Sequence, residues 1–309
     1  MPDVLSLWQT PARVALISPA GAVDPARYDL TLRRLADAGI TVCPGPEALA
    51  RCRYLAGTAR ARVDDLYQAF ERDDIDAVWC LRGGYGAAHL LPLIDWSRLT
   101  QGAKRPLIGY SDVTVLLDAF YQHGLDAIHA AVATEVALVP TWPPAREEDR
   151  WRSLQSIESA WHASSGRMAS TPFSGPALTV SGQLRGGNLV TLASLCGTPN
   201  ALALKQPTLL MLEEVEEVDF RIERCFHQLL SSIDTRWLSG VCLGSFTRQG
   251  EPTYSSHDTL AEWLGPLNIP LHHRLPFGHH PLNQAWPYGA LGTLSASGGL
   301  CWHKTVKSV

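Results

Sequence analysis

The sequence predicts an α/β fold in which a parallel sheet with helices on both faces is followed by a β-rich α+β domain. Three observations carry this prediction. Residues 13–132 alternate apolar runs with amphipathic stretches, whereas the second half is rich in short apolar runs. The length of 309 residues favours about two domains, and an apolar content of 46% is enough for a sizeable core.

The first half alternates expected strands and helices. Short apolar runs, typical of buried strands, lie at 13–18, 40–43, 75–81 and 107–110. Amphipathic helices are expected at 25–38, between Pro25 and Gly39, at 59–72, and directly after the last of these strands. Because helices separate successive strands, we expect a parallel sheet covered on both faces.

The second half of the sequence has a different pattern of expected strands and helices. Strands are expected at 177–180, 208–212, 240–246 and 291–294, with one clear helix around 222–229. The composition changes near the prolines at 140, 143 and 144, and a charged run follows. We therefore expect an N-terminal domain at 1–145, a linker with a bridging helix at 146–175, and a C-terminal domain at 176–309.

Charge and cysteine content exclude several classes of protein. The 26 basic and 30 acidic residues give a net charge of −4, so nothing indicates a nucleic-acid or anionic-membrane partner.

The first residues lack the basic region of a signal peptide, and no apolar run approaches the ~18 residues of a transmembrane helix. Seven scattered cysteines without CxxC spacing indicate buried, reduced thiols in a cytoplasmic protein rather than a zinc site or disulfides.

The segment Leu107–Val113 (LIGYSDV) is the strongest local indication of chemistry. A strand runs into Ser111 and a helix leaves from Asp112, which lifts the hydroxyl above the carboxyl edge of the sheet. The N–H of Asp112 then points at an oxyanion beside the serine. Val113 replaces the second glycine of GxSxG. The alternative is that Ser111 or Asp112 serves only as a helix N-cap.

The glycine-rich run Leu81–Gly86 (LRGGYG) follows another strand and is expected at the same edge. Such a loop can cradle an oxyanion or a phosphate with its N–H groups. It lacks the spacing of a dinucleotide fingerprint and the lysine of a P-loop. The alternative is a tight βα turn without chemistry.

An acid and a histidine complete a possible triad. Glu213 follows four apolar residues, and a partly buried carboxylate there needs a partner such as histidine. The alternative is a solvated acidic surface. The segment 272–281 holds four of the eleven histidines without metal-ligand spacing, so no metal is expected. His279, presented by a Pro-Phe-Gly turn, fits a general base. Ser111, Glu213 and His279 are the candidate triad, since chain order varies between folds.

Seven ordered segments carry a resemblance to a known family. The sequence resembles the LD-carboxypeptidases, serine peptidases also called muramoyltetrapeptide carboxypeptidases. The resemblance spans Val14 to about Thr293 and rests on VALISPAGAVD, LRGGYGAAHLLPLIDW, IGYSDVTVLL, GQLRGGNLVTLASLCGTP, LMLEEVEEVDFRIERCFHQLL, GVCLGSF and LPFGH. It implies a flavodoxin-like N-terminal domain, a β-rich C-terminal domain, an active site at their junction and a homodimer. Its nucleophile, acid and histidine fall on Ser111, Glu213 and His279.

The expected reaction is removal of a C-terminal D-alanine from a muropeptide tetrapeptide during cytoplasmic recycling, without a cofactor. The N–H groups of Gly84 and Asp112 are expected to bind the oxyanion. Arg82 and Arg185 are candidates for gripping the substrate carboxylate or for an internal ion pair. Where the family often has Glu-Asp, this chain has Glu213-Glu214, and where it often has His-Gly-Pro, this chain has 129–131 as His-Ala-Ala.

Three other functions are open. A related branch of the fold hydrolyses peptidyl-nucleotide antibiotics and confers self-immunity, although the GGYGAAHLLPLIDW segment is more similar to the recycling branch. A non-enzymatic protein would use the glycine loops to bind nucleotide. A binding module without catalysis would keep the fold alone.

Overall fold

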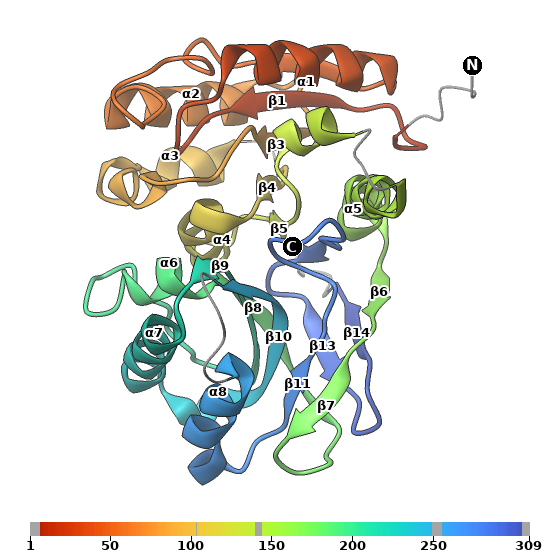
Figure 1. Cartoon of the computed structure of the whole chain (residues 1–309). Coiled ribbons are helices and arrows are strands. Elements are labelled where there is room, and N and C mark those ends of the chain that lie inside the picture. The colour runs from red at the N-terminus through yellow and green to blue at the C-terminus, as the bar shows by residue number, and fades with distance from the viewer. Residues whose placement is uncertain (1–6, 103, 140–143, 249–254, 305–309) are drawn as a thin grey trace. The chain divides into compact units, whose positions relative to one another are not determined.

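A computed structural model describes residues 7–102, 104–139, 144–248 and 255–304 (Figure 1). Contacts divide the chain into two compact units, one of residues 1–162 with Gln284–Trp286, the other of residues 163–283 and 287–309. Pro140 and Pro143, where the composition changes, lie outside the described residues. Helix α5 (Pro144–His162) belongs to the first unit. The three segments expected from the sequence, 1–145, 146–175 and 176–309, remain a prediction.

The first unit is built on a six-stranded sheet in the order β12-β5-β4-β3-β1-β2. Neighbouring strands from β2 through β5 pair in parallel, as the alternation of strands and helices predicts. The predicted α/β fold with a parallel N-terminal sheet is therefore confirmed. The strands are β1 (Arg13–Ile17), β2 (Thr41–Pro44), β3 (Ala77–Cys80), β4 (Leu107–Gly109), β5 (Ala127–His129) and β12 (Trp286–Pro287).

Helices cover this sheet in two groups. Helix α1 (Pro25–Asp37) and α5 contact the short 3₁₀ helix η4 (Ala133–Leu138). Helices α2 (Ala59–Glu71), α3 (Trp96–Gln101) and α4 (Thr114–Gln122) form the other group, in which Phe70 packs on Phe120 with ring centroids 5.3 Å apart. Asp24 caps α1 by accepting from the N–H of Arg27, and Thr58 caps α2 in the same way.

The second unit holds an eight-stranded mixed sheet in the order β6-β14-β13-β8-β9-β10-β11-β7. Strands β8 to β11 run parallel, and the outer strands pair antiparallel. Helices α6, α7 and α8 lie together beside β9 and β11 (Figure 1). The elements are β6 (Ser165–Met168), β7 (Thr171–Ser174), β8 (Val180–Asn188), α6 (Leu189–Ala193), β9 (Thr208–Glu217), α7 (Asp219–Ser232), β10 (Leu238–Arg248), α8 (Ser256–Leu264), β11 (Leu271–His273), β13 (Leu291–Leu294) and β14 (Leu300–His303).

Two strands of this unit differ from the sequence expectation. The strand expected at 177–180 is wrong, because β8 begins only at Val180 and continues through a glycine-rich stretch for which no strand was expected. That stretch becomes a strand because β9 and β13 flank it and pair with its backbone. Strand β9 continues past 212 to Glu217, so Glu213 lies inside a strand rather than at its end.

All seven cysteines are free, as expected, but only Cys80 and Cys242 are buried. The expectation of buried thiols is therefore wrong for the other five, which are partly exposed. Burial raises the pKa of Cys242 to about 12, which makes this thiol unreactive at neutral pH. Within the described residues, no helix is both long and apolar enough to span a bilayer.

Candidate active site

Ser111 lies on a strained turn at the carboxyl edge of the six-stranded sheet. Strand β4 ends at Gly109, the 3₁₀ turn η3 (Ser111–Val113) follows, and α4 starts at Thr114. Ser111 has a φ of 63°, in the left-handed region that non-glycine residues rarely adopt. Strain of this kind persists only where the surrounding structure enforces it, and it is frequent at functional sites.

The glycine loop after β3 lies directly against this serine. A Cβ added to Gly83 would sit 2.8 Å from the Cβ and 3.0 Å from the Oγ of Ser111, so only glycine allows the approach. The expectation that the loops after β3 and β4 meet at one sheet edge is thereby confirmed for these two residues. The same virtual Cβ would lie 3.3 Å from the main-chain nitrogen of Asp112.

The main-chain N–H groups of Gly84 and Asp112 have no hydrogen-bond acceptor within the described residues. The carbonyl of Gly83 accepts from the N–H of Gly21 at 3.0 Å, and a planar trans peptide then turns the N–H of Gly84 the opposite way. Unsatisfied N–H groups beside a hydroxyl are the arrangement that stabilises a developing oxyanion.

The side chain of Asp112 supports the glycine loop rather than capping a helix. Its Oδ2 accepts from the N–H of Ala87 at 2.8 Å. Burial raises the pKa of Asp112, although the hydrogen bond from Ala87 and the charge of Arg62 oppose the increase. The cap positions of η3 and α4 are Tyr110 and Val113, which make no side-chain cap. The alternative that Ser111 or Asp112 is simply an N-cap is therefore not supported.

In the second unit, His279 is hydrogen-bonded to Glu213. The His279 Nδ1 lies 2.6 Å from the Glu213 Oε2, and the N–H of His279 donates to the same oxygen at 3.2 Å. The Glu213 side chain is fully buried, whereas 18% of the His279 side chain is exposed. A carboxylate on Nδ1 fixes the ring so that Nε2 remains for proton transfer.

The neighbouring acid, Glu214, has different partners. It accepts from the Nδ2 of Asn188 at 2.9 Å and from the N–H of Val190 at 2.8 Å. Successive side chains of a strand point to opposite faces, which separates Glu213 from Glu214. Burial raises the pKa of Glu214 above its ordinary value. Glu213 is thus the acid that contacts His279.

A tight turn presents His279. Gly278 has a φ of 99°, and a Cβ there would lie 2.6 Å from the Cβ of Glu213 and 2.7 Å from the Oγ of Ser245. Its N–H donates to the Oδ1 of Asn283, a buried amide that the sequence reasoning did not single out. Glycine is therefore required for the histidine to approach the acid.

The two candidate arginines differ in exposure. Arg185 is buried and donates to the carbonyl of Ala203 at 2.6 Å. Arg82 is exposed and donates one bond, at 2.7 Å, to the carbonyl of Ala22. A Cβ on Gly84 would lie 3.7 Å from the Arg82 Nε, so this guanidinium is adjacent to the glycine loop.

The structure groups the candidate residues by unit. Ser111, Gly84 and Asp112 lie together in the first, and Glu213 and His279 lie together in the second. Among the described residues, no cluster of three or more His, Cys, Asp or Glu side chains is arranged to hold a metal ion.

A serine on a strained strand–helix turn beside N–H groups without an acceptor, in the first unit, and a carboxylate-bound histidine, in the second, are each features found in serine hydrolases. Residues 14–130 match the LD-carboxypeptidase N-terminal domain, and residues 181–294 match the LD-carboxypeptidase C-terminal domain. The chain belongs to the LD-carboxypeptidase family, as the sequence resemblance indicates.

Individual relatives agree with this assignment. The murein tetrapeptide carboxypeptidase of Pseudomonas aeruginosa is 44% identical over 293 residues, which cover 94% of this chain and 95% of the relative. The muramoyltetrapeptide carboxypeptidase structure from Oxalobacter formigenes has a TM-score of 0.82 at 24% identity, covering 94% of this chain and 98% of its own. MccF in complex with glutamyl sulfamoyl guanosine has a TM-score of 0.81 at 18% identity, covering 96% and 97%. At these identities, the two structures show a shared fold.

Proposed function

We propose that this chain is a serine LD-carboxypeptidase that removes the C-terminal D-alanine of muropeptide tetrapeptides, cutting after an L-centred diamino acid. The observation that carries the proposal is the His279–Glu213 pair at 2.6 Å, together with the strained turn at Ser111. The 44% identity to a murein tetrapeptide carboxypeptidase over nearly the whole chain supports the substrate class.

In the proposed reaction, His279 takes the proton of Ser111 as the serine oxygen attacks the carbonyl before D-alanine. The N–H groups of Gly84 and Asp112 stabilise the resulting oxyanion, and Glu213 stabilises the imidazolium. His279 then donates its proton to the leaving amine, and D-alanine departs from the acyl-enzyme. Water, activated by the same histidine, hydrolyses the ester and restores Ser111.

The decisive experiment incubates the purified protein with a muropeptide tetrapeptide and follows the products by mass spectrometry. We expect the loss of one alanine from the wild type and no loss with Ser111→Ala. An unchanged tetrapeptide with the folded wild type rules out the proposed substrate. A peptidyl-nucleotide amide forms the second arm of the assay, and its cleavage in place of the tetrapeptide identifies the immunity-type activity instead.

The acid is tested by two isosteric variants. Glu213→Gln keeps the shape but replaces the acceptor that His279 requires, so kcat should fall by several orders of magnitude, on the order of 10⁴-fold by analogy with amide replacement in a triad. Glu214→Gln, whose side chain contacts Asn188, should have a milder effect on kcat. If Glu213→Gln kept the wild-type kcat and Glu214→Gln were inactive, Glu214 rather than Glu213 would be the acid that orients His279.

The exposed Arg82 is the proposed anchor for the free carboxylate of the substrate. Its guanidinium lies beside the glycine loop in the first unit. Arg82→Met should raise KM about tenfold or more and change kcat less, because a carboxylate contact is made equally in the ground state and the transition state. An unchanged KM excludes Arg82.

Assembly and location are part of the proposal. We expect a homodimer, which light scattering of the purified protein measures directly. We also expect a cytoplasmic enzyme of peptidoglycan recycling, which cell fractionation tests.

A further inference from the structure

Arg62 is a buried arginine on α2 that no step of the proposed reaction uses. Only 2% of it is exposed, and it lies on the buried side of the helix with Asp65 and apolar residues such as Leu66. Its Nη1 donates to the carbonyls of Pro19 at 2.7 Å and Gly86 at 2.9 Å. These carbonyls belong to the loops after β1 and β3, so the guanidinium joins two loops at the carboxyl edge.

The carbonyl of Gly86 and the N–H of Ala87 belong to one peptide unit. Arg62 donates to that carbonyl, and the carboxylate of Asp112 accepts from that N–H at 2.8 Å. The peptide is therefore held at both ends by groups of opposite charge, and each bond polarises the other. Asp112 is the residue after the nucleophile, and its own N–H is a proposed oxyanion donor.

The same loops carry the other proposed donor. The N–H of Gly21 holds the carbonyl of Gly83, which sets the direction of the Gly84 N–H. Arg62 binds the carbonyl of Pro19, two residues before Gly21. Arg62 thus contacts the loops after β1 and β3, and the backbone of these loops helps to set the directions of the Gly84 and Asp112 N–H groups.

We infer that Arg62 is a positioning residue for the oxyanion hole, acting through the Gly86–Ala87 peptide on Asp112 and through the Pro19 carbonyl on Gly84. The inference rests on the proposed function. Arg62 touches no substrate, and its effect is to hold two N–H groups where charge develops. A displacement of about 1 Å in such a group costs on the order of 10²-fold in rate.

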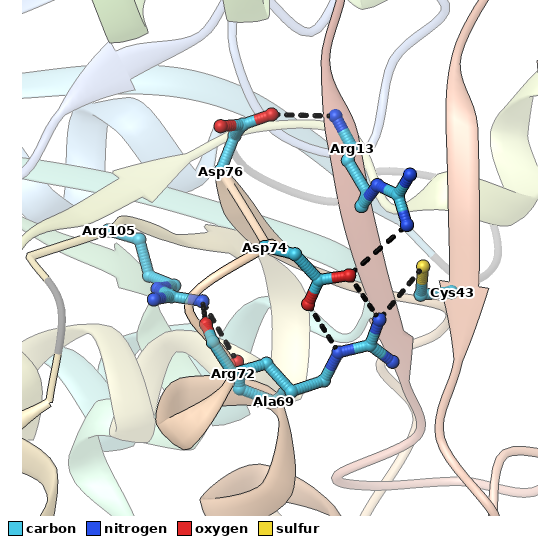
Figure 2. A network of polar contacts seen from close by, with 7 residues as sticks. All are labelled: Arg13, Cys43, Ala69, Arg72, Asp74, Asp76 and Arg105. Carbon is cyan, nitrogen blue, oxygen red and sulfur yellow. Dashed lines mark hydrogen bonds and ion pairs between the residues drawn. The ribbon is translucent and has the colours of Figure 1, made fainter.

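A second buried arginine in the same unit provides a matched control. Arg105 is 3% exposed and likewise donates to two main-chain carbonyls, those of Ala69 and Arg72 (Figure 2). It precedes β4 and therefore lies at the amino edge of the sheet, opposite the edge that carries Ser111. Arg62→Met removes a buried guanidinium from the carbonyls of Pro19 and Gly86 and from that of Thr58 on its own helix, and Arg105→Met removes one from two carbonyls.

The test compares kcat, KM and Tm of the two full-length variants with a tetrapeptide, well below both melting temperatures. We expect both to lower Tm, but only Arg62→Met to lower kcat by on the order of 10²-fold, with KM changed less than about threefold. Equal kcat values in the two variants overturn the inference. If either methionine variant does not fold, kcat, KM and Tm are compared between Arg62→Lys and Arg105→Lys instead.

Two further measurements separate positioning from general stability. In a double-mutant cycle, Arg62→Lys should cost less in an Asp112→Asn background than in the wild type, because the two side chains act on one peptide. Labelling of Ser111 by a serine-directed phosphonate also needs the oxyanion hole but no particular peptide. It should slow in Arg62→Met and not in Arg105→Met, even if the wild type leaves the tetrapeptide intact and the proposed substrate is wrong. Additive costs, or equal labelling rates, contradict the assignment.

Discussion

The two edges of the six-stranded sheet differ in their charged groups, although each also has a buried arginine, Arg105 or Arg62, that binds main-chain carbonyls. At the amino edge, exposed ion pairs join strand starts to the end of α2: Asp74 contacts Arg13 at 3.1 Å and Arg72 at 2.8 Å (Figure 2). At the carboxyl edge, buried side chains such as Arg62 and Asp112 bind main-chain groups of loops. Exposed ion pairs contribute little to the stability of the fold, whereas buried charges that bind main-chain groups fix the geometry of the backbone.

From the difference between the two edges we expect backbone strain at the carboxyl edge, where Ser111 has a positive φ. Ser111→Ala and Ser111→Gly should both reduce activity by on the order of 10⁴-fold or more. Ser111→Gly should nevertheless unfold with a free energy about 1 kcal/mol above that of Ser111→Ala, because glycine accepts a positive φ without strain. Urea denaturation of the two variants measures this difference. Equal free energies would show that the turn is unstrained.

A matched pair of glycines compares packing at the two edges. A Cβ on Gly83 would lie 2.8 Å from the Ser111 Cβ, and a Cβ on Gly102, near the amino edge, would lie 2.8 Å from the carbonyl oxygen of Phe70. We expect both alanine variants to lose stability, but only Gly83→Ala to lose on the order of 10²-fold in kcat. A comparable loss of kcat in Gly102→Ala breaks the distinction between the edges.

Ser111, the glycine loop and Glu213 could be singled out from the sequence because each follows an apolar run that marks a buried strand, and His279 because a Pro-Phe-Gly turn precedes it in a histidine-rich segment. Arg62 was missed for a physical reason. It lies on a helix recognised by its apolar spacing, and nothing in that pattern shows that two loop carbonyls meet its guanidinium. The strained φ of Ser111 and the role of Asn283 likewise depend on tertiary contacts, as does the pairing of Trp286 with the first sheet.

Buried and exposed carboxylates should give opposite pH dependences. Asp65 on α2 accepts from the N–H of Glu47, in the loop after β2, and burial raises its pKa from 3.8 to about 6. The folded state therefore binds the proton more tightly, so stability falls as pH rises from about 4 to about 6. This change is at most about 3 kcal/mol. Asp65→Asn should abolish it, as urea titrations across this range would show. A slope that survives in the variant contradicts the assignment to Asp65.

The smallest effect is expected at Asp74. Its hydrogen bonds with Arg72 lower its pKa to about 2, so the stability that it contributes is present above pH 4 and is lost as pH falls towards 2. At neutral pH, Asp74→Asn should melt close to the wild type, with kcat unchanged, and the remaining difference should vanish in about 1 M salt. A large, salt-resistant loss of Tm would show that the amino edge also relies on a strong charged contact.

The return of the chain at Gln284–Trp286 has a consequence for how the protein is made. Strand β12 adds next to β5, and the Trp286 ring stacks on His129 with centroids 4.8 Å apart. When only residues 1–162 have left the ribosome, the six-stranded sheet therefore still lacks strand β12. The nascent first unit must wait for more than a hundred further residues before its edge is covered, and during that interval the exposed edge of β5 is a site for chaperone binding or mispairing.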